Sequence, residues 1–274
     1  MEKKIKKIAS LHLAEQTPGF TSTGVMNAEY NTEPYLVFGE FYMDRSVFGP
    51  HAHAGVSVMT YVLPDSKGSF LNRDSLGDHT IIGPGGVQVT QTGSGIYHDE
   101  LPEIPGTNCH AFQIWINHGA KDRLVEPKAL HLPAKEVPEF KTEQVLLRVI
   151  QGNYQDLQSP LKLVTETLLF DVAMQPNAVL ELAAMEMTFI YLISGRIVIN
   201  GKEIAGRSLV KFADEGESIV VTTSGDNANF MFASGTPHHE PIIYGGPFVM
   251  TTQQQMQETR QRQQRGEMGF LLPV

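Results

Sequence analysis

Cysteine is almost absent from this 274-residue sequence, which has only Cys109. A single thiol forbids an internal disulfide and leaves no cysteine pair for a thiolate zinc site or a redox Cys-x-x-Cys motif. A reducing compartment suits such a chain, so we expect a cytoplasmic protein.

Long hydrophobic runs are also missing. The most apolar window, residues 185–193, contains Glu186 and is far shorter than the roughly 20 residues of a membrane helix. At the N-terminus, four lysines precede a stretch that His12 and Glu15 interrupt, without the small-residue cleavage pattern of a signal peptide. The sequence therefore predicts a soluble protein with no membrane contact.

Positive charge is scarce, because 21 Lys and Arg residues face 30 Asp and Glu residues and leave a net charge of −9. Such a surface repels phosphate backbones, so direct nucleic-acid binding is not expected. A hydrophobic content of 41% excludes disorder of the whole chain, and 25 glycines with 16 prolines suit a fold with many turns.

What the sequence does contain is a succession of short β-rich runs. Between residues 35 and 116, runs such as PYLVFGEFYM and CHAFQIWIN alternate with turn segments such as PDSKG and GPGG. Residues 121–142 hold three prolines and many charges, and we interpret them as a surface linker. The β pattern resumes at Val145, and a weak match of residues 60–70 to residues 189–199 favours two copies of one barrel. A β-sandwich without internal repetition is the alternative.

The end of the chain changes character, with seven glutamines in residues 253–264. Thr252 and Gln255 have the spacing of a capping box, and Gly266 supplies a stop signal. The pattern predicts a short polar surface helix. A partner-binding or aggregation-prone glutamine tract is the less favoured alternative.

Most of the ten histidines have neighbours that indicate no chemical role. Beside charged, turn or linker residues, four are expected to be solvated: His12, His79, His118 and His131. His110 lies on a predicted strand, and a Pro-flanked loop contains His238 and His239.

Two segments differ from this background. His51 and His53 in FGPHAHAG are two residues apart, so a strand would point both imidazoles to one face. His98 and Glu100 in GIYHDEL have the same spacing. Facing antiparallel strands inside a barrel would combine three neutral nitrogens and one carboxylate, a ligand set for a transition metal with open positions. Two unrelated surface pairs are the alternative.

The same segments resemble the pirin family of bicupins. FGPHAHAG, NRDSLGDHTIIGPGGVQV, TGSGIYHDELP and FQIWINHGAKDRLVEPKALHLPAKEVPEF occur in the family's order, and GTPHHEPIIYGGPFVMTTQQQMQE resembles its C-terminal end. The resemblance covers about residues 35–269. It implies an all-β fold of two cupin barrels, which are double-stranded β-helices of the jelly-roll type, with a short C-terminal α-helix.

The resemblance also divides the chain into a metal-binding barrel, residues 1–132, and a metal-free barrel with the closing helix, residues 133–274. It implies one mononuclear metal, which we expect to be iron(II), while the ligand types also permit manganese, nickel, copper or zinc. No other cofactor is expected. The implied metal ligands are His51, His53, His98 and Glu100.

The second barrel is expected to lack these ligands. Aligning Tyr191 with Tyr61 places Glu181 and Ala183 opposite the two histidines of the HAH segment. A metal centre is therefore predicted only in the first barrel.

Four positions depart from the family pattern. Ala52 and Ala54 replace a proline and an arginine around the histidines, Val89 replaces a tryptophan of many members, and Ser94 replaces an arginine. These replacements are expected to change the rim and wall of the pocket, which should be roomier and less attractive to anions.

The function that the resemblance implies is a metal-dependent dioxygenase of the quercetin 2,3-dioxygenase type. Its partners would be dioxygen and a small aromatic or flavonoid-like substrate, with Glu100 as the general base toward the substrate hydroxyl. One alternative is a redox-sensitive regulatory protein that resembles transcription cofactors, binds a protein partner and catalyses no turnover. Another is a structural cupin with a vestigial site. A monomer is expected, as in the family.

Overall fold

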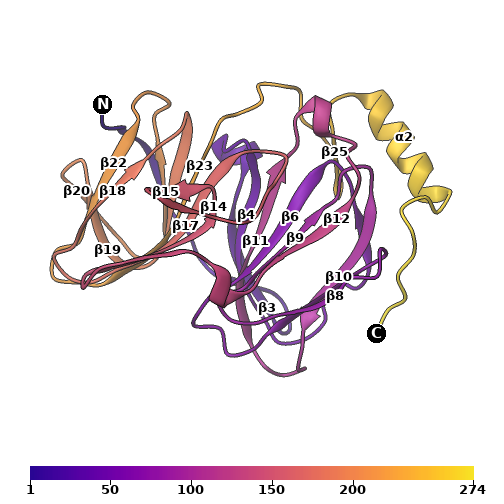
Figure 1. Ribbon diagram of the computed structural model, residues 1–274, viewed down its shortest axis with the longest axis horizontal. Coiled ribbons are helices and arrows are strands. Elements are labelled where there is room, and N and C mark those ends of the chain that lie inside the picture. The colour runs from indigo at the N-terminus through magenta and orange to yellow at the C-terminus, as the bar shows by residue number, and fades with distance from the viewer.

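The computed structural model describes residues 1–274, and they form two β-barrels packed side by side (Figure 1). The helical part is small: α1 (Asn27–Tyr30), two short 3-10 turns, and the C-terminal helix α2 (Gln253–Gln264). The predicted all-β fold of two cupin barrels with a short C-terminal helix is confirmed. None of the helices has the length and apolar character needed to cross a membrane.

The first barrel consists of a seven-stranded sheet and a four-stranded sheet. The larger sheet runs in the order β12 (Lys128–Leu132), β9 (Val87–Gln91), β6 (Val56–Val62), β11 (Cys109–Asn117), β4 (Tyr35–Met43), β3 (Phe20–Met26) and β2 (Ala14–Thr17). The smaller sheet runs in the order β5 (His51–His53), β10 (Ile96–Pro102), β7 (Phe70–Asp74) and β8 (His79–Ile82).

The strands of the second barrel form one ten-stranded sheet. Its main strand path is β1 (Ile5–Ser10), β21 (Ser208–Phe212), β19 (Met187–Ile199), β23 (Ala228–Gly235), β17 (Thr167–Met174), β14 (Val145–Gln151) and β13 (Glu139–Lys141). The strands β18 (Val179–Ala183), β22 (Ser218–Thr222) and β20 (Lys202–Ala205) branch from β19 and close the barrel. Two small hairpins complete the fold: β15 (Asn153–Tyr154) with β16 (Leu157–Gln158), and β24 (Ile243–Gly245) with β25 (Phe248–Met250).

The segment between the barrels, residues 121–142, is more ordered than the predicted surface linker. It contains β12, which pairs with β9, and β13, which pairs with β14. Leu132 and Val137 are buried in the main hydrophobic core. The linker interpretation was wrong here because short edge strands bury only one or two apolar side chains each, too few for a visible period of two.

The two ends of the chain cross to the opposite barrels. β1, from the N-terminus, pairs with β21 of the second barrel. At the other end, β25 forms a bridge from Phe248 to Ala54, and the helix α2 lies against the first barrel (Figure 1). Both chain ends therefore lie against the barrel on the other side of the predicted division at residues 132 and 133.

A continuous apolar core joins the barrels across their larger sheets. It includes Phe38 and Phe112 from the first barrel and Phe189 and Tyr191 from the second. The ring centroids of Phe38 and Phe189 lie 5.1 Å apart in an edge-on arrangement that aromatic pairs favour. Burial of this shared surface makes the two barrels one packed unit.

One carboxylate crosses the same interface. Glu40 on β4 is fully buried and accepts hydrogen bonds from Arg207 Nε at 2.6 Å and from the Tyr191 hydroxyl at 2.9 Å. His110 Nε2 lies 2.9 Å from its other oxygen. Burial alone would raise the pKa of Glu40, but His110, Arg207 and Tyr191 outweigh it and hold that pKa below its usual value.

The C-terminal helix has the predicted capping box. The Thr252 hydroxyl accepts a hydrogen bond from the Gln255 backbone N–H at 3.1 Å, and the Gln255 side chain accepts one from the Thr252 N–H at 3.2 Å. Met256 and Thr259 are buried, so this helix has a covered face as well as its polar one.

Candidate metal centre

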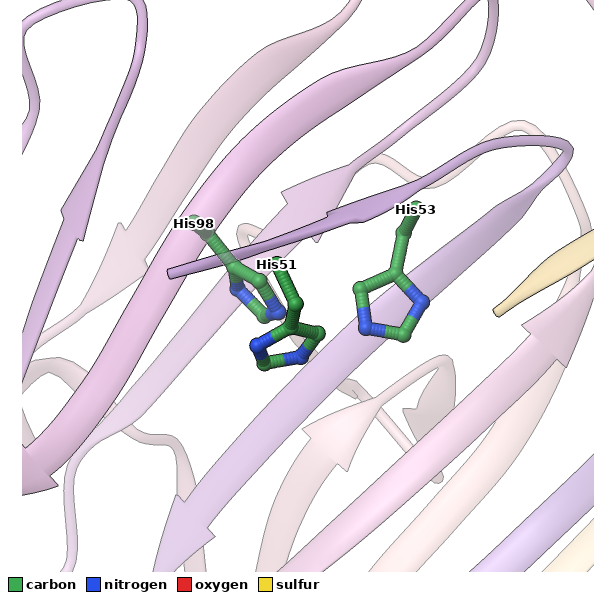
Figure 2. Close-up of side chains that lie close together, drawn as sticks. All are labelled: His51, His53 and His98. Carbon is green, nitrogen blue, oxygen red and sulfur yellow. The ribbon is translucent and has the colours of Figure 1, made fainter. Parts of the chain in front are cut away.

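Three of the four predicted site residues meet inside the first barrel. β10 pairs antiparallel with β5 so that His98 lies directly opposite His51, and His53 projects from β5 to the same side (Figure 2). The ring centroids of the three imidazoles lie 4.7 to 4.9 Å apart. One ligand atom from each residue lies within 4.8 Å of the others, so the cluster has the size of a metal site.

Backbone carbonyls orient two of the imidazoles. His51 Nδ1 lies 2.8 Å from the Gly49 carbonyl oxygen, and His53 Nδ1 lies 3.1 Å from that of Pro247. A carbonyl only accepts hydrogen bonds, so each Nδ1 carries the proton and each Nε2 keeps a free lone pair. This is the arrangement found around metal-ligating histidines.

His98 strengthens the case for a metal. Both of its ring nitrogens are buried and have no hydrogen-bond partner within the protein. A buried polar nitrogen without a partner is costly, and coordination to a cation would satisfy it. The donor set of three neutral imidazoles suits a divalent transition metal, and its composition leaves the identity of the metal open.

The protonation states are consistent with ligation. Burial, with a smaller contribution from His51, lowers the pKa of His53 to about 3. Burial also lowers the pKa of His98 well below its usual value, with His53 and His51 adding to the effect. Neutral imidazoles are the form that binds metals.

Glu100 lies beside the imidazole cluster. Its Oε2 is 4.0 Å from His98 Nδ1, and its Oε1 accepts a hydrogen bond from the Thr60 hydroxyl. Gln113 Nε2 donates to the Thr60 oxygen at 3.0 Å, which leaves the Thr60 proton for Glu100. Oε2 therefore remains free to face a ligand. Burial raises the pKa of Glu100 to about 7, although the bond from Thr60 and the nearby Gln113 amide oppose the rise.

Thr60 and Gln113 were not predicted as site residues. They lie opposite each other on β6 and β11, each between apolar neighbours. A polar residue in a buried strand is a weak signal, and only the packing of the two sheets shows that Thr60 and Gln113 approach Glu100.

A cavity of about 310 Å³ opens on this cluster. Trp115 forms one wall, with its ring edge-on to His53 at a centroid distance of 4.8 Å. Phe48 is 58% exposed and packs edge-on against Phe20 at 5.1 Å. The remaining aromatic lining comes from Phe41 and Phe70, so the cavity suits a planar apolar ligand with a polar group at its inner end.

The four departures from the family pattern do not line this cavity. Ala52 and Ala54 point to the other face of β5 and pack against the segment that contains Phe248. Val89 is buried in the core between the barrels, and Ser94 lies in a turn where its N–H bonds to the Val125 carbonyl. The expectation that these residues widen the pocket was wrong, because strand alternation directs the two alanines away from it.

The second barrel presents a different interior at the corresponding strands. On β18, Leu180 and Leu182 are buried whereas Glu181 and Ala183 are exposed. The prediction that Glu181 and Ala183 occupy the histidine positions was wrong by one residue. A shift of one residue on a strand exchanges the two faces, so the inward positions belong to the leucines.

One further histidine differs from its prediction. His118, expected to be solvated, is fully buried, and its Nε2 lies 2.9 Å from the Ser57 hydroxyl. Burial, with the nearby Arg123 charge, lowers its pKa to about 3. The charged residues that follow His118 in the sequence suggest an exposed position. In the structure, however, the end of β11 and the residue after it are buried.

The chain matches known families over both barrels. The family model described as Pirin matches residues 12–116, and the model described as Pirin C-terminal cupin domain matches residues 169–269. Human pirin is 31% identical over 238 residues, which cover 83% of this chain and 80% of that protein.

Two solved structures share the fold. A quercetin 2,3-dioxygenase from Acinetobacter baumannii has a TM-score of 0.89 at 23% identity and covers 99% of this chain and 100% of its own. The bacterial pirin from Escherichia coli in complex with nickel(II) has a TM-score of 0.65 at 21% identity and covers 84% and 100%. These structures support the cupin fold, and the family models together with the human relative show that this chain belongs to the pirin family.

Proposed function

We propose that this protein is a metal-dependent dioxygenase that acts on a small aromatic, flavonol-like substrate in the first barrel. The observation that carries the proposal is the pair of unpartnered His98 nitrogens beside two imidazoles with free Nε2 atoms, at the inner end of an aromatic cavity. The similarity to a structure named as a quercetin 2,3-dioxygenase supports the same substrate class.

In this proposal His51, His53 and His98 hold one divalent metal, with Glu100 as the fourth ligand. Iron(II) is the metal we propose. The related Escherichia coli structure contains nickel(II), and imidazole ligands accept either ion. When bound, the metal supplies Lewis acidity toward the substrate hydroxyl and redox chemistry toward dioxygen.

The residues of the chain have separate tasks. The rings of Trp115 and Phe41 hold the planar substrate with its hydroxyl group toward the histidines, which restricts it to a reactive orientation. Glu100 accepts the hydroxyl proton, and the Thr60 hydroxyl holds its carboxylate in place through a hydrogen bond to Oε1. The apolar walls reduce access of water to the reacting atoms.

The proposal also covers the partners, oligomeric state and location of the protein. The net charge of −9 disfavours nucleic acid as a partner, and we propose a monomeric cytoplasmic enzyme that uses dioxygen as its co-substrate.

Elemental analysis combined with oxygen uptake on addition of quercetin tests this function. We expect about one metal per chain and quercetin-dependent uptake, both lost in a His51→Ala, His98→Ala double variant. Metal without uptake for quercetin or related flavonols would reject the dioxygenase and favour the redox-sensitive regulatory protein. A folded protein that binds no metal would indicate a vestigial site.

A further inference from the structure

The end of the chain lies across the back of the metal centre. We call residues 243–269, which comprise β24, β25, α2 and the turn after it, the C-terminal strap. They follow the second barrel in sequence, yet α2 and β25 lie beside the first barrel (Figure 1). The strap covers the outer faces of β5 and β10, the two strands whose inner faces present His51, His53 and His98.

Backbone contacts hold the strap close to β5. The Val249 N–H donates to the Ala54 carbonyl at 3.0 Å. The next residue, Gly55, has a φ of +83°, and a Cβ there would lie only 1.9 Å from the Val249 carbonyl oxygen. Only glycine permits this approach, so the local sequence is adapted to the strap.

Side-chain packing extends the attachment. Ala52 and Ala54 are small enough to let the strap pack directly on β5, where they form a buried cluster with Phe248, Met250, Met256 and Met268. The Ser75 hydroxyl donates to the Met268 carbonyl at 2.8 Å, and the Gln263 side chain donates to the Tyr97 hydroxyl at 3.0 Å.

The strap also reaches the site itself. Pro247 lines the cavity, and its carbonyl oxygen is the partner of His53 Nδ1 at 3.1 Å (Figure 2 shows the pale yellow C-terminal segment on the His53 side of the cluster). His51 differs, because its carbonyl partner, Gly49, lies only two residues before it in the sequence. Of the two oriented imidazoles, only His53 depends on a segment that is distant in sequence.

We propose that the C-terminal strap is a positioning element of the metal centre, in which the Pro247 carbonyl holds His53 in the Nδ1–H form and so sets the affinity for the metal. The inference rests on the metal site of the proposed function but not on the reaction. Loss of such an outer hydrogen bond typically lowers metal affinity about 10- to 100-fold.

The test is a Met256→Asp, Met268→Asp double variant of the full chain, which places two carboxylates in the buried cluster under the strap. Gln257→Asp, at an exposed position of the same helix, is the matched control. Long-range ¹H–¹⁵N correlation spectra of the metal-free proteins report the histidine tautomers, with His51 as the internal reference. Titration with nickel(II) against a chelator reports affinity.

We expect His53 to lose its single Nδ1–H signature in the double variant while His51 keeps its own, with nickel(II) affinity reduced at least tenfold and the control unchanged. Hydrogen exchange of the Val249 amide shows whether the strap has detached. A detached strap with unaltered His53 tautomer and affinity would overturn the proposal, as would a mixed His53 tautomer in the wild type. If the double variant does not fold, Met268→Ala repeats the comparison with a smaller expected shift.

The result of this test does not depend on whether the protein has the proposed dioxygenase activity. If the wild type consumes no oxygen with flavonols but the His53 tautomer and nickel(II) affinity change together, the proposed activity fails and the role of the strap stands. If oxygen uptake is present and neither readout changes, the strap proposal fails alone.

Discussion

The two barrels place different side chains on equivalent strand pairs. In the first, β5 and β10 bring His51 opposite His98. In the second, β18 and β22 bring Leu180 opposite Val221 and Leu182 opposite Ile219, all buried. Corresponding strand pairs therefore present a cluster of imidazoles beside a cavity in one barrel and a solid apolar interior in the other.

The second barrel has the larger apolar core of its own, and the candidate metal centre lies in the first. The apolar cluster of the second barrel has 21 buried residues, whereas the largest cluster confined to the first barrel has 7. Each fully buried aliphatic side chain contributes about 1.5–3 kcal/mol, whereas a buried imidazole without a partner is unfavourable. The first barrel tolerates its site because it shares a second core with its neighbour.

The largest expected effect comes from replacing histidines of the first barrel with leucine, the residue type found inside the second barrel. A His51→Leu, His98→Leu double variant should lose its metal completely, because only one imidazole remains. The melting temperature of its metal-free form should equal or exceed that of the metal-free wild type, since unpartnered nitrogens are replaced by apolar groups. Elemental analysis and calorimetry measure both, with His12→Leu as an exposed control. Retained metal would refute the ligand assignment.

The second barrel should lose stability when an apolar side chain is removed from its interior. Leu182→Ala removes a fully buried side chain from the apolar cluster, and we expect a loss of about 3 kcal/mol in the free energy of unfolding. The metal content should not change. Urea denaturation supplies the measurement, and Val179→Ala at the exposed end of the same strand is the control. A loss below about 1 kcal/mol would contradict a tightly packed second interior.

Within the first barrel, the carboxylate should matter for rate more than for metal content. Glu100→Gln keeps the size of the side chain but removes the proton-accepting oxygen, so we expect kcat to fall about 100-fold with metal occupancy largely preserved. Steady-state oxygen uptake and elemental analysis give the two values. A variant that keeps metal and full activity would remove Glu100 from the mechanism.

The ion pair of Glu40 with Arg207, which joins the barrels, should give the smallest change in the free energy of unfolding. This change should depend on pH. Glu40→Gln leaves Arg207 without its anionic partner, and because Arg207 is partly exposed we expect a loss of about 2 kcal/mol at pH 7. Because the folded pKa of Glu40 lies below the ordinary value of 4.5, its stabilisation is complete above pH 4.5 and is lost as the pH falls through the folded pKa.

The difference between wild type and this variant should therefore shrink at pH 3. Denaturation curves at pH 7 and pH 3 test this, with Glu203→Gln in the exposed pair with Arg196 as control. A difference that is constant with pH would show that Glu40 contributes through packing rather than through its charge.

Much of the site was predictable because its signal is local. The two-residue spacing of His51 and His53 places both rings on one face wherever a strand forms, and the structure brings His98 to them. The capping box at Thr252 is equally local. The prediction failed on β18, because the sequence there does not show which alternate residues point into the barrel.

Other features depended on segments that are distant in sequence. No spacing rule connects Pro247 to His53, because 194 residues separate them. The bond from Thr60 to Glu100 joins strands of two different sheets. Such contacts form only when the sheets pack, so they cannot be predicted from a sequence pattern.

The sequence by itself determined the all-β fold, the family and the three histidines, because strand periodicity, turn residues and short motifs act over a few residues. Only the tertiary structure decided which carbonyls orient those histidines, which aromatic side chains form the cavity, and that the strap from the end of the chain covers β5. These depend on packing between segments far apart in the chain, where burial and close approach select the contacts.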